Sequence, residues 1–360
     1  MVSLRCRIAP SIIESARIAY APAGDVNFDQ WLSESASGGI RYYSLARHAL
    51  TEALRVAEIG PGDAVLLPEF LCRDVLASLS ELNAIPRWYP VGEDLTPVGM
   101  PDAWPDARAV LAVDYFGFPQ PLEPFRAYAA RTGVLIIEDN AHGFLSRDEN
   151  GQYLGTRGDL GIFSLRKTLP LADGAALMAG SPELAGRLRN QVPPAGLGYA
   201  PNAARKARLR RTPGVGVAVA SVTTSLVRTL RRLRTDHAIP PPEREAETSI
   251  PHPPAPHAGL AKGLAALDVG SEIDRRRDLY RAAEQAARVI GIVPAFPGLP
   301  PLVAPYGFPF RTNASEALRE MNRWAVRRGL DLIRWPDLPD ALTTSAPAHY
   351  RNLYLVNFLW

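Results

Sequence analysis

Short apolar runs alternate with segments of helical spacing between residues 40 and 190 of this chain. Most of the runs contain no polar residue, which is typical of strands that are buried on both faces of a sheet. Strands that alternate with helices indicate parallel pairing, with helices on both faces. The predicted strands are residues 64–67, 85–89, 109–113, 134–137, 161–165 and 175–178, and the predicted helices are 42–56, 71–82 and 122–131.

The pattern changes after residue 192. A basic stretch at 205–234 leads into a proline-rich connection, and proline breaks helices and stiffens an extended path. Ordered spacing then returns, with strands expected at 306–310 and 330–333 and helices at 273–290 and 316–328. The sequence therefore predicts three parts: a large domain at 1–192, a variable connection at 193–257 and a small α/β C-terminal domain at 258–360.

Composition narrows the class of protein. The chain has 360 residues, 47% of them apolar and 21% charged, with a net charge of +3, which is ordinary for a globular protein and favours no polyanionic partner. Its two cysteines form no disulfide framework, and no apolar stretch is long enough to span a membrane, so a cytoplasmic protein is expected. The basic stretch lacks the interleaved aromatic residues of a nucleic-acid platform, although it could touch a membrane surface or an acidic partner.

Two segments carry the candidate chemistry. The apolar strand at 134–137 runs into Glu138-Asp139-Asn140-Ala141-His142, and a later strand runs into Ser164-Leu165-Arg166-Lys167. In open parallel sheets, ligands bind at the carboxyl ends of the strands, so these side chains should share a cleft, together with Asp114, Pro68 and Glu69. A lysine that forms a Schiff base, and a carboxylate that keeps a pyridine nitrogen protonated, are what a pyridoxal phosphate enzyme needs.

These segments resemble the DegT/StrS-type pyridoxal phosphate-dependent sugar aminotransferases. The resemblance rests on Glu-Asp-x-Ala-His, on Gly-x-x-Gly-Asp-x-Gly-x-Phe-Ser at 155–164, on the lysine, and on the later Asp173-Gly174. Upstream, 59–68 and Tyr-Phe-Gly-Phe-Pro at 115–119 also fit. The resemblance implies the fold-type I architecture: a mostly parallel central sheet with helices on both faces, a small C-terminal domain, and a homodimer with the cleft at the subunit interface.

The resemblance assigns catalytic roles to three residues. Lys167 would form the Schiff base and shuttle the proton, which requires a pKa lowered by burial and neighbours. Asp139 would pair with the pyridinium nitrogen, and His142 would lie near the phenolic oxygen of the cofactor. The alternatives are structural: a surface lysine, an aspartate that caps a turn, and a packed histidine. Asp159 competes with Asp139 for the ring nitrogen, but its position after Gly158 favours a turn.

Other residues would bind the remaining parts of the cofactor. Ser164 is a candidate phosphate contact, and Ala46 and Arg47 occupy the place where a helix N-terminus receives the phosphate. Either Phe70 or Cys72 would stack on the ring, or both would simply be core residues. The Gly-Tyr-Asn-Tyr-Arg motif that the family often carries is missing. In the C-terminal part, Arg311 or Arg334 could clamp the carboxylate of an amino donor, or both could form surface ion pairs.

The expected function follows from the resemblance. An amino group would pass from a glutamate-like amino acid to a keto group on a sugar or on a secondary-metabolite intermediate. Lys167 is retained, which favours transamination over the related dehydratases, which carry histidine at this place. Two alternatives stay open: another pyridoxal phosphate reaction on the same fold, such as a lyase or condensation, and a non-catalytic binding protein.

Overall fold

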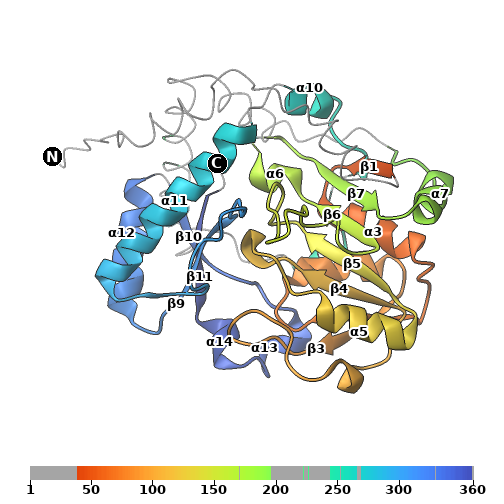
Figure 1. Cartoon of the computed structure of the whole chain (residues 1–360), viewed down its shortest axis with the longest axis horizontal. Helices are drawn as coiled ribbons and strands as arrows, with labels where there is room; N and C mark the ends of the chain where they lie inside the picture. Colours follow the sequence, from red (N-terminus) through yellow and green to blue (C-terminus); the bar gives the residue numbers. More distant parts are fainter. Residues whose placement is uncertain are drawn as a thin grey trace.

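The computed structural model describes residues 39–169, 171–195, 222, 226, 244–251, 253–265, 269–328 and 330–358. Nearly all of the basic stretch at 205–234 lies outside the described residues, so its predicted role is left as a prediction. Two sheets organise the described chain, one from its first half and one from its last third (Figure 1).

The first half forms a seven-stranded sheet in the order β1-β7-β6-β5-β4-β2-β3. The five strands from the β3 edge to β6 pair in parallel, as the unbroken apolar runs predict, whereas β7 pairs antiparallel with both β6 and β1. The strands are β1 (Gly39–Tyr43), β2 (Ala64–Pro68), β3 (Ile85–Tyr89), β4 (Ala109–Val113), β5 (Leu135–Asn140), β6 (Leu160–Phe163) and β7 (Ala175–Ala179).

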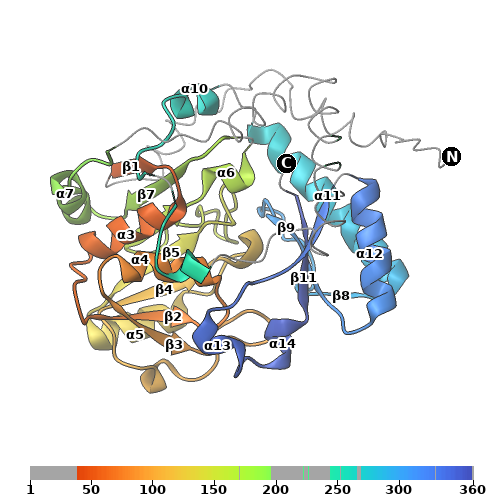
Figure 2. The ribbon, with the colours of Figure 1, turned by 180° about the vertical axis from the view of Figure 1, so that it is seen from behind.

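Helices lie on both faces of this sheet, as predicted. Figures 1 and 2 show α5 (Glu123–Thr132) on one face and α3 (Ala46–Val56) with α4 (Leu76–Ser80) on the other. Near the β1 edge lies α7 (Pro182–Asn190), which begins at a Ser181 side-chain cap.

Two helix predictions need correction. The helix expected over 42–56 begins at Ala46, because residues 39–43 pair as a strand with β7. The helix expected over 71–82 is reduced to the 3-10 turn η1 (Arg73–Val75) and the short α4. In the first case, pairing with a distant strand outweighs a helical pattern, because tertiary contacts override local propensity.

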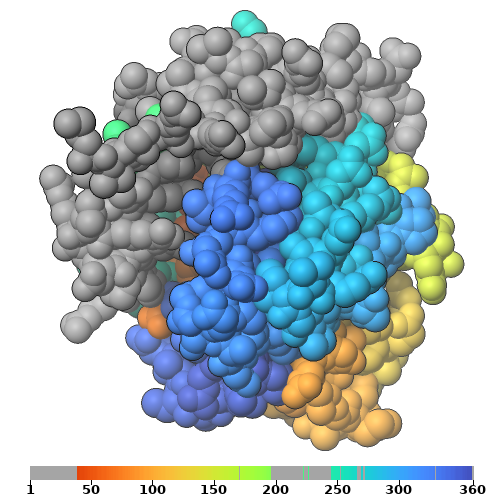
Figure 3. Space-filling model, turned by 90° about the vertical axis from the view of Figure 1, so that its left-hand side faces the viewer, coloured from red at the N-terminus to blue at the C-terminus, as the bar shows by residue number. Residues whose placement is uncertain are grey.

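The last third forms a four-stranded antiparallel sheet in the order β10-β11-β9-β8. Its long helices, α11 (Val269–Ile290) and α12 (Ser315–Arg327), run side by side on the outer face of the molecule (Figure 3). The sequence pattern did not predict β11 (Leu353–Asn357), which is the central partner of β9 (Gly307–Arg311) and β10 (Asp331–Arg334). Shorter elements are β8 (Val293–Pro294), α10 (Leu260–Ala265), α13 (Asp340–Thr343) and α14 (Ala348–Arg351).

One hydrophobic core runs through both sheets, from Tyr43 in β1 to Phe358 after β11. A second cluster packs Phe163 and Leu165 against Leu260 and Leu264 of α10. The continuous core explains why the C-terminal sheet stays against the large one. The predicted domain boundaries at 192 and 257 remain a prediction.

The strand register places the candidate acid at the carboxyl edge of the large sheet. Asp139 of β5 lies opposite Val113 of β4 on one side and Ile162 of β6 on the other. Ser164 follows the last residue of β6, and Lys167 lies within the short helix α6 (Leu165–Thr168). In the described residues, no helix is both long and apolar enough to cross a membrane.

Candidate active site

A pocket lies at this carboxyl edge. It is lined by side chains from the N-terminus of α3, the segment after β2, the ends of β4, β5 and β6, the turn α6 and the loop after β10. The lining consists of Leu45, Ala46, Arg47, Leu50, Leu71, Cys72, Asp74, Val75, Val113, Asp139, Ala141, His142, Ile162, Ser164, Arg166, Lys167 and Trp335. The structure therefore brings Lys167, Asp139, His142, Ser164, Ala46, Arg47 and Cys72 together, whereas Phe70 does not line the pocket.

Asp139 is a buried carboxylate with an incomplete set of partners. Its Oδ1 accepts a hydrogen bond from the backbone N–H of Ala141 at 2.9 Å. Burial raises the pKa of Asp139, and the Ala141 N–H and the charge of Lys167 offset that rise in part. A buried carboxylate of this kind gains from a cationic N–H donor in the pocket.

Lys167 and His142 form the opposite polar pair. Lys167 Nζ lies 3.2 Å from His142 Nε2, within hydrogen-bond distance. Burial lowers the pKa of Lys167, and the neighbouring Arg166 lowers it further, although Cys72, Asp74 and Asp139 act in the other direction. Burial and Lys167 hold the pKa of His142 well below its usual range, so the imidazole is neutral and its Nε2 can accept a hydrogen bond from the lysine.

Aromatic rings fix the orientation of His142. Its imidazole stacks on Tyr306, with ring centroids 4.4 Å apart and planes 4° from parallel, and Phe116 stacks at 5.8 Å. The Trp335 ring meets the imidazole edge-on at 5.4 Å. Stacked rings on both sides leave the imidazole little freedom to turn away from Lys167.

Two arginines fasten the C-terminal part of the chain to the pocket. Arg276 of α11 is fully buried, pairs with Glu272, and donates to the carbonyl oxygens of Lys167 at 3.1 Å and Thr168 at 2.8 Å. At the other end, Arg73 of η1 pairs with Asp337 at 2.9 Å and with Asp340, also at 2.9 Å. The position of the lysine turn therefore depends on a helix more than 100 residues further along the chain.

The N-terminus of α3 also lines the pocket. Leu45 occupies the N-cap position and provides no side-chain cap, and no acidic residue lies in the first turn. The first backbone N–H groups of a helix need an external acceptor. Because Ala46, Arg47 and Ser164 line the same pocket, an anion bound there would meet N–H groups, a hydroxyl and a guanidinium.

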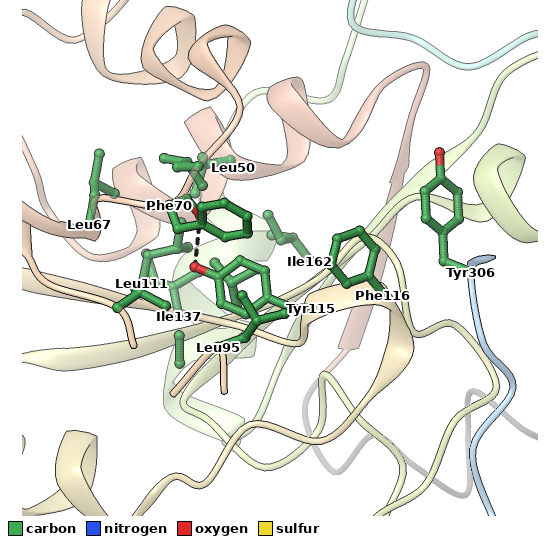
Figure 4. Packing of buried hydrophobic residues seen from close by; sticks show 14 of the residues in the cluster. Leu50, Leu67, Phe70, Leu95, Leu111, Tyr115, Phe116, Ile137, Ile162 and Tyr306 are labelled. Carbon is green, nitrogen blue, oxygen red and sulfur yellow. Dashed lines mark hydrogen bonds between the residues drawn. The ribbon is translucent and has the colours of Figure 1, made fainter. Parts of the chain in front are cut away.

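Between the two stacking candidates, Phe70 lies in the core. Figure 4 shows its ring beside Tyr115, whose hydroxyl donates to the Phe70 carbonyl oxygen at 2.8 Å. The Phe70 ring also packs against Trp335 and Tyr350, at centroid distances of 5.1 and 5.0 Å. Cys72 does line the pocket, and burial raises the pKa of its thiol to about 12, so the thiol is neutral and serves as a packing surface.

Asp114 does not join the pocket, contrary to the expectation of a shared cleft. It is fully buried beside Glu138, and Arg157 binds both carboxylates, at 2.8 Å and 2.6 Å. Asp159, the competing candidate for the ring nitrogen, accepts a hydrogen bond from the Ile136 N–H at 2.7 Å and so holds a turn to β5. Both carboxylates are structural members of the sheet edge.

The two C-terminal arginines also lie away from the pocket. Arg311 ends β9 near Glu93 and Asp94, and Arg334 lines a separate surface hollow with Arg351 and Tyr354. Sequence reasoning instead missed the pocket residues Arg166, Asp74 and Trp335. Arg166 had a readable signal, since a second cation directly before the lysine is unusual at the end of a buried strand. Trp335 had none, because its role depends on how the two sheets meet.

The fold and the site together define a class of protein. The chain has the fold-type I architecture of pyridoxal phosphate-dependent transferases, and solved structures share it. An aminotransferase, TlmJ from Streptoalloteichus hindustanus, matches with a TM-score of 0.58 and 20% identity over 96% of this chain and 89% of that one. The predicted fold class is confirmed.

Sequence comparisons point to one family among the proteins that share this fold. Residues 43–195 match the model of the DegT/DnrJ/EryC1/StrS aminotransferase family, which confirms the resemblance predicted from the sequence. Protein MosB of Rhizobium meliloti is 31% identical over 49% of this chain and 36% of its own length. UDP-N-acetyl-3-dehydro-alpha-D-glucosamine 3-aminotransferase of Acidithiobacillus ferrooxidans is 34% identical over 39% of this chain and 40% of its own. The matches thus span less than half the length of both curated relatives.

Proposed function

We propose that this chain is a pyridoxal phosphate-dependent aminotransferase that moves an amino group from a glutamate-like amino acid to a keto group. The observation that carries the proposal is the convergence of Asp139 and Lys167 in one pocket at the carboxyl edge of the sheet. Each is shifted from its ordinary pKa, the acid upward and the amine downward, mainly by burial. Perturbed groups that face a shared pocket are typical of active sites.

The side chains fit the cofactor group by group. Asp139 would hold the ring nitrogen, since a pyridinium N–H would supply the cationic partner that this buried carboxylate needs. His142 would donate to or accept from the phenolic oxygen, beside the amine of Lys167. Ser164 and the N–H groups at Ala46 and Arg47 would receive the phosphate. When bound, pyridoxal phosphate supplies an electron sink for the bonds around the amino carbon.

The remaining chemistry belongs to Lys167. Once its amine is neutral, Nζ can take a proton from one carbon of the bound amino compound and return it to a neighbouring atom. Burial and the charge of Arg166 both favour the neutral amine. His142 Nε2, 3.2 Å away and itself neutral, can orient the amine lone pair between these two positions without competing for a permanent proton.

The acceptor is proposed to be a keto sugar, or a secondary-metabolite intermediate that carries a keto group. The family match and the relative named for a 3-dehydro sugar nucleotide support this choice. We further propose that the protein works as a cytoplasmic homodimer with the pocket near the subunit interface, with no nucleic-acid partner and no membrane span. Light scattering that finds only monomer at assay concentrations would contradict the dimer.

The competing function is another pyridoxal phosphate reaction on the same fold, a lyase or a condensation. The absence of the Gly-Tyr-Asn-Tyr-Arg motif from the sequence keeps this alternative in view. A lysine at 167, where the related dehydratases carry histidine, favours transamination.

A half-reaction separates these possibilities. The reconstituted protein is mixed with glutamate and no acceptor, and the absorbance of the cofactor is followed. Conversion of the cofactor to its amine form, with release of the 2-oxo acid, is expected. If no amino acid in a panel of donors produces that conversion, transamination is wrong.

The attachment site has a sharp test, because the chain contains three lysines: Lys167, Lys206 and Lys262. Borohydride reduction of the reconstituted protein, followed by peptide mass mapping, is expected to find the pyridoxyl group on Lys167 alone. An adduct on Lys262, which is exposed on α10, would indicate unspecific labelling. A protein that gains no adduct would favour the non-catalytic alternative.

A further inference from the structure

Arg166 is a pocket residue with one unpaired hydrogen-bond donor. It lines the pocket beside Ser164 and Lys167, and its Nε is buried without a hydrogen-bond partner in the described chain. Leaving a guanidinium donor unpaired in a buried position costs free energy. Since the described chain supplies no acceptor to that Nε, the donor is available to a bound anion.

A second arginine lies close by. Arg47 lines the same pocket, and its Nε is 3.6 Å from a carboxylate oxygen of the half-exposed Asp74, a loose contact. Burial lowers the pKa of Arg166, and the positive charge of Arg47 is among the forces that lower it further, although Tyr306 and Asp74 oppose them. Two like charges held together in a buried site are unfavourable by themselves, and an anion between them removes that cost.

The charges of the side chains that line the pocket also favour an anionic ligand. Three cations, Arg47, Arg166 and Lys167, face two carboxylates, Asp74 and Asp139. The uncapped N-terminus of α3 adds partial positive charge at the same end. Asp139 belongs to β5, between Val113 and Ile162 in the sheet register, whereas Arg166 belongs to α6, so the two charged groups come from different elements. The positive surplus suits a ligand group that carries close to two negative charges.

We propose that Arg166 and Arg47 form a two-arginine clamp that binds the phosphate of the cofactor, with the unpaired Nε of Arg166 as one of its donors. The inference rests on the proposed function and deepens it by assigning a residue that the sequence motifs do not assign. A guanidinium offers a planar fork that pairs with two oxygens of a phosphate at once. A single carboxylate of an amino donor would neutralise one arginine, whereas a phosphate can neutralise both.

The test compares two ligands that differ in the phosphate alone. Pyridoxal phosphate and pyridoxal are titrated into the cofactor-free full chain, and binding is read from absorbance, without any turnover. In Arg166→Gln, the dissociation constant for pyridoxal phosphate is expected to rise at least about tenfold, as the loss of a charged hydrogen bond implies. The constant for pyridoxal is expected to stay within about twofold, since pyridoxal has no group for the clamp.

Matched variants complete the design. Arg166→Lys keeps the charge without the fork, so an intermediate loss for pyridoxal phosphate is expected. Arg281→Gln removes an exposed arginine of α11, paired at 2.9 Å with Asp278, and should leave both ligands unchanged. Inorganic phosphate should compete with pyridoxal phosphate in the wild type and much less in Arg166→Gln. Unchanged pyridoxal binding also shows that each variant is folded.

The outcomes separate the two proposals. If the wild type binds neither ligand, the proposed function fails and the clamp fails with it. If the wild type binds both, but Arg166→Gln weakens both equally or neither, the clamp alone is wrong. Intact binding of pyridoxal phosphate combined with a raised KM for the amino donor would assign Arg166 to the donor carboxylate and overturn the inference.

Discussion

Glu138 and Asp139 are neighbours in β5, yet they lie in two different electrostatic regions. The Glu138 carboxylate accepts hydrogen bonds from the Arg157 Nε at 2.8 Å, from the Arg157 backbone N–H at 2.7 Å and from the Gly158 N–H at 3.2 Å. Asp139 faces the pocket, where the Ala141 N–H is the hydrogen-bond donor found for it among the described residues. Successive side chains of a strand point to opposite faces of the sheet. The Glu138 carboxylate therefore pairs with Arg157 inside the protein, whereas the Asp139 carboxylate lines the pocket.

The buried arginines repeat this difference. Arg276 pairs with Glu272 and donates to four carbonyl oxygens, those of Lys167, Thr168, Pro305 and Tyr306. The Nε of Arg166 has no partner in the described chain. Arg276, with several partners, holds α11 to the lysine turn, whereas Arg166 lies in the pocket with an unpaired Nε to which a ligand can bind.

The largest effect is expected for the amine of the pocket. Lys167→Ala should lower the rate of the glutamate half-reaction by at least about 10³-fold, because it removes the amine that is proposed to carry the proton. Rapid-mixing absorbance measures the rate. Lys262→Ala is the matched control, since Lys262 is exposed on α10 and should leave the rate unchanged. A Lys167→Ala protein with near-normal turnover would remove the site from this pocket.

The second effect concerns the scaffold cluster. Arg157→Gln leaves Asp114 and Glu138 facing each other without a cation, although burial and Glu138 already raise the pKa of Asp114 well above its usual range. The free energy of unfolding in urea is expected to fall by about 3–5 kcal/mol. Arg126→Gln, which breaks an exposed pair with Glu123 at 3.8 Å, should cost less than about 1 kcal/mol. Equal losses in the two variants would contradict the distinction.

Asp139→Asn should separate activity from stability. The half-reaction is expected to slow by about 10²-fold, because an amide does not hold a proton at the ring nitrogen. The cofactor-free protein should nevertheless become more stable in thermal unfolding, since a carboxylate that burial destabilises has been neutralised. Asp159→Asn is the opposite control: it weakens the acceptor of the Ile136 N–H, so stability should fall while the rate persists.

The smallest expected effect is the pH dependence of the stability gained by cofactor-free Asp139→Asn. Burial raises the pKa of Asp139 in the folded chain above its value in the unfolded chain, so the folded state takes up the proton at higher pH. The stability gained when Asp139 is protonated is therefore fully present below the unfolded-state pKa, and it is lost as pH rises through the folded-state pKa. The advantage of cofactor-free Asp139→Asn should therefore be greatest near neutral pH and disappear on acidification. A gain that is constant with pH would assign it to packing.

Much of the fold could be predicted from local pattern. The unbroken apolar runs predict β2 and β4 within one residue at each end and β5 up to three residues short of its end, and the 3.6-residue period predicts α5 and α12. Strand β1 was missed, because its pairing partner β7 lies more than 130 residues away. Register against a distant strand leaves no signal in a short window.

The candidate site divides in the same way. The sequence determined that an acid and an amine follow two buried strands, and this placed Asp139 and Lys167 at the sheet edge, where their proposed roles remain to be tested. Tertiary structure decided which charged groups find partners. Arg157 pairs with Glu138, and Arg276 hydrogen-bonds to the carbonyl oxygen of Lys167 across 109 residues of sequence. The Nε of Arg166, in contrast, has no partner in the described chain. The reason is physical, since the energy of a buried charge depends on the groups around it in space, whichever part of the chain provides them.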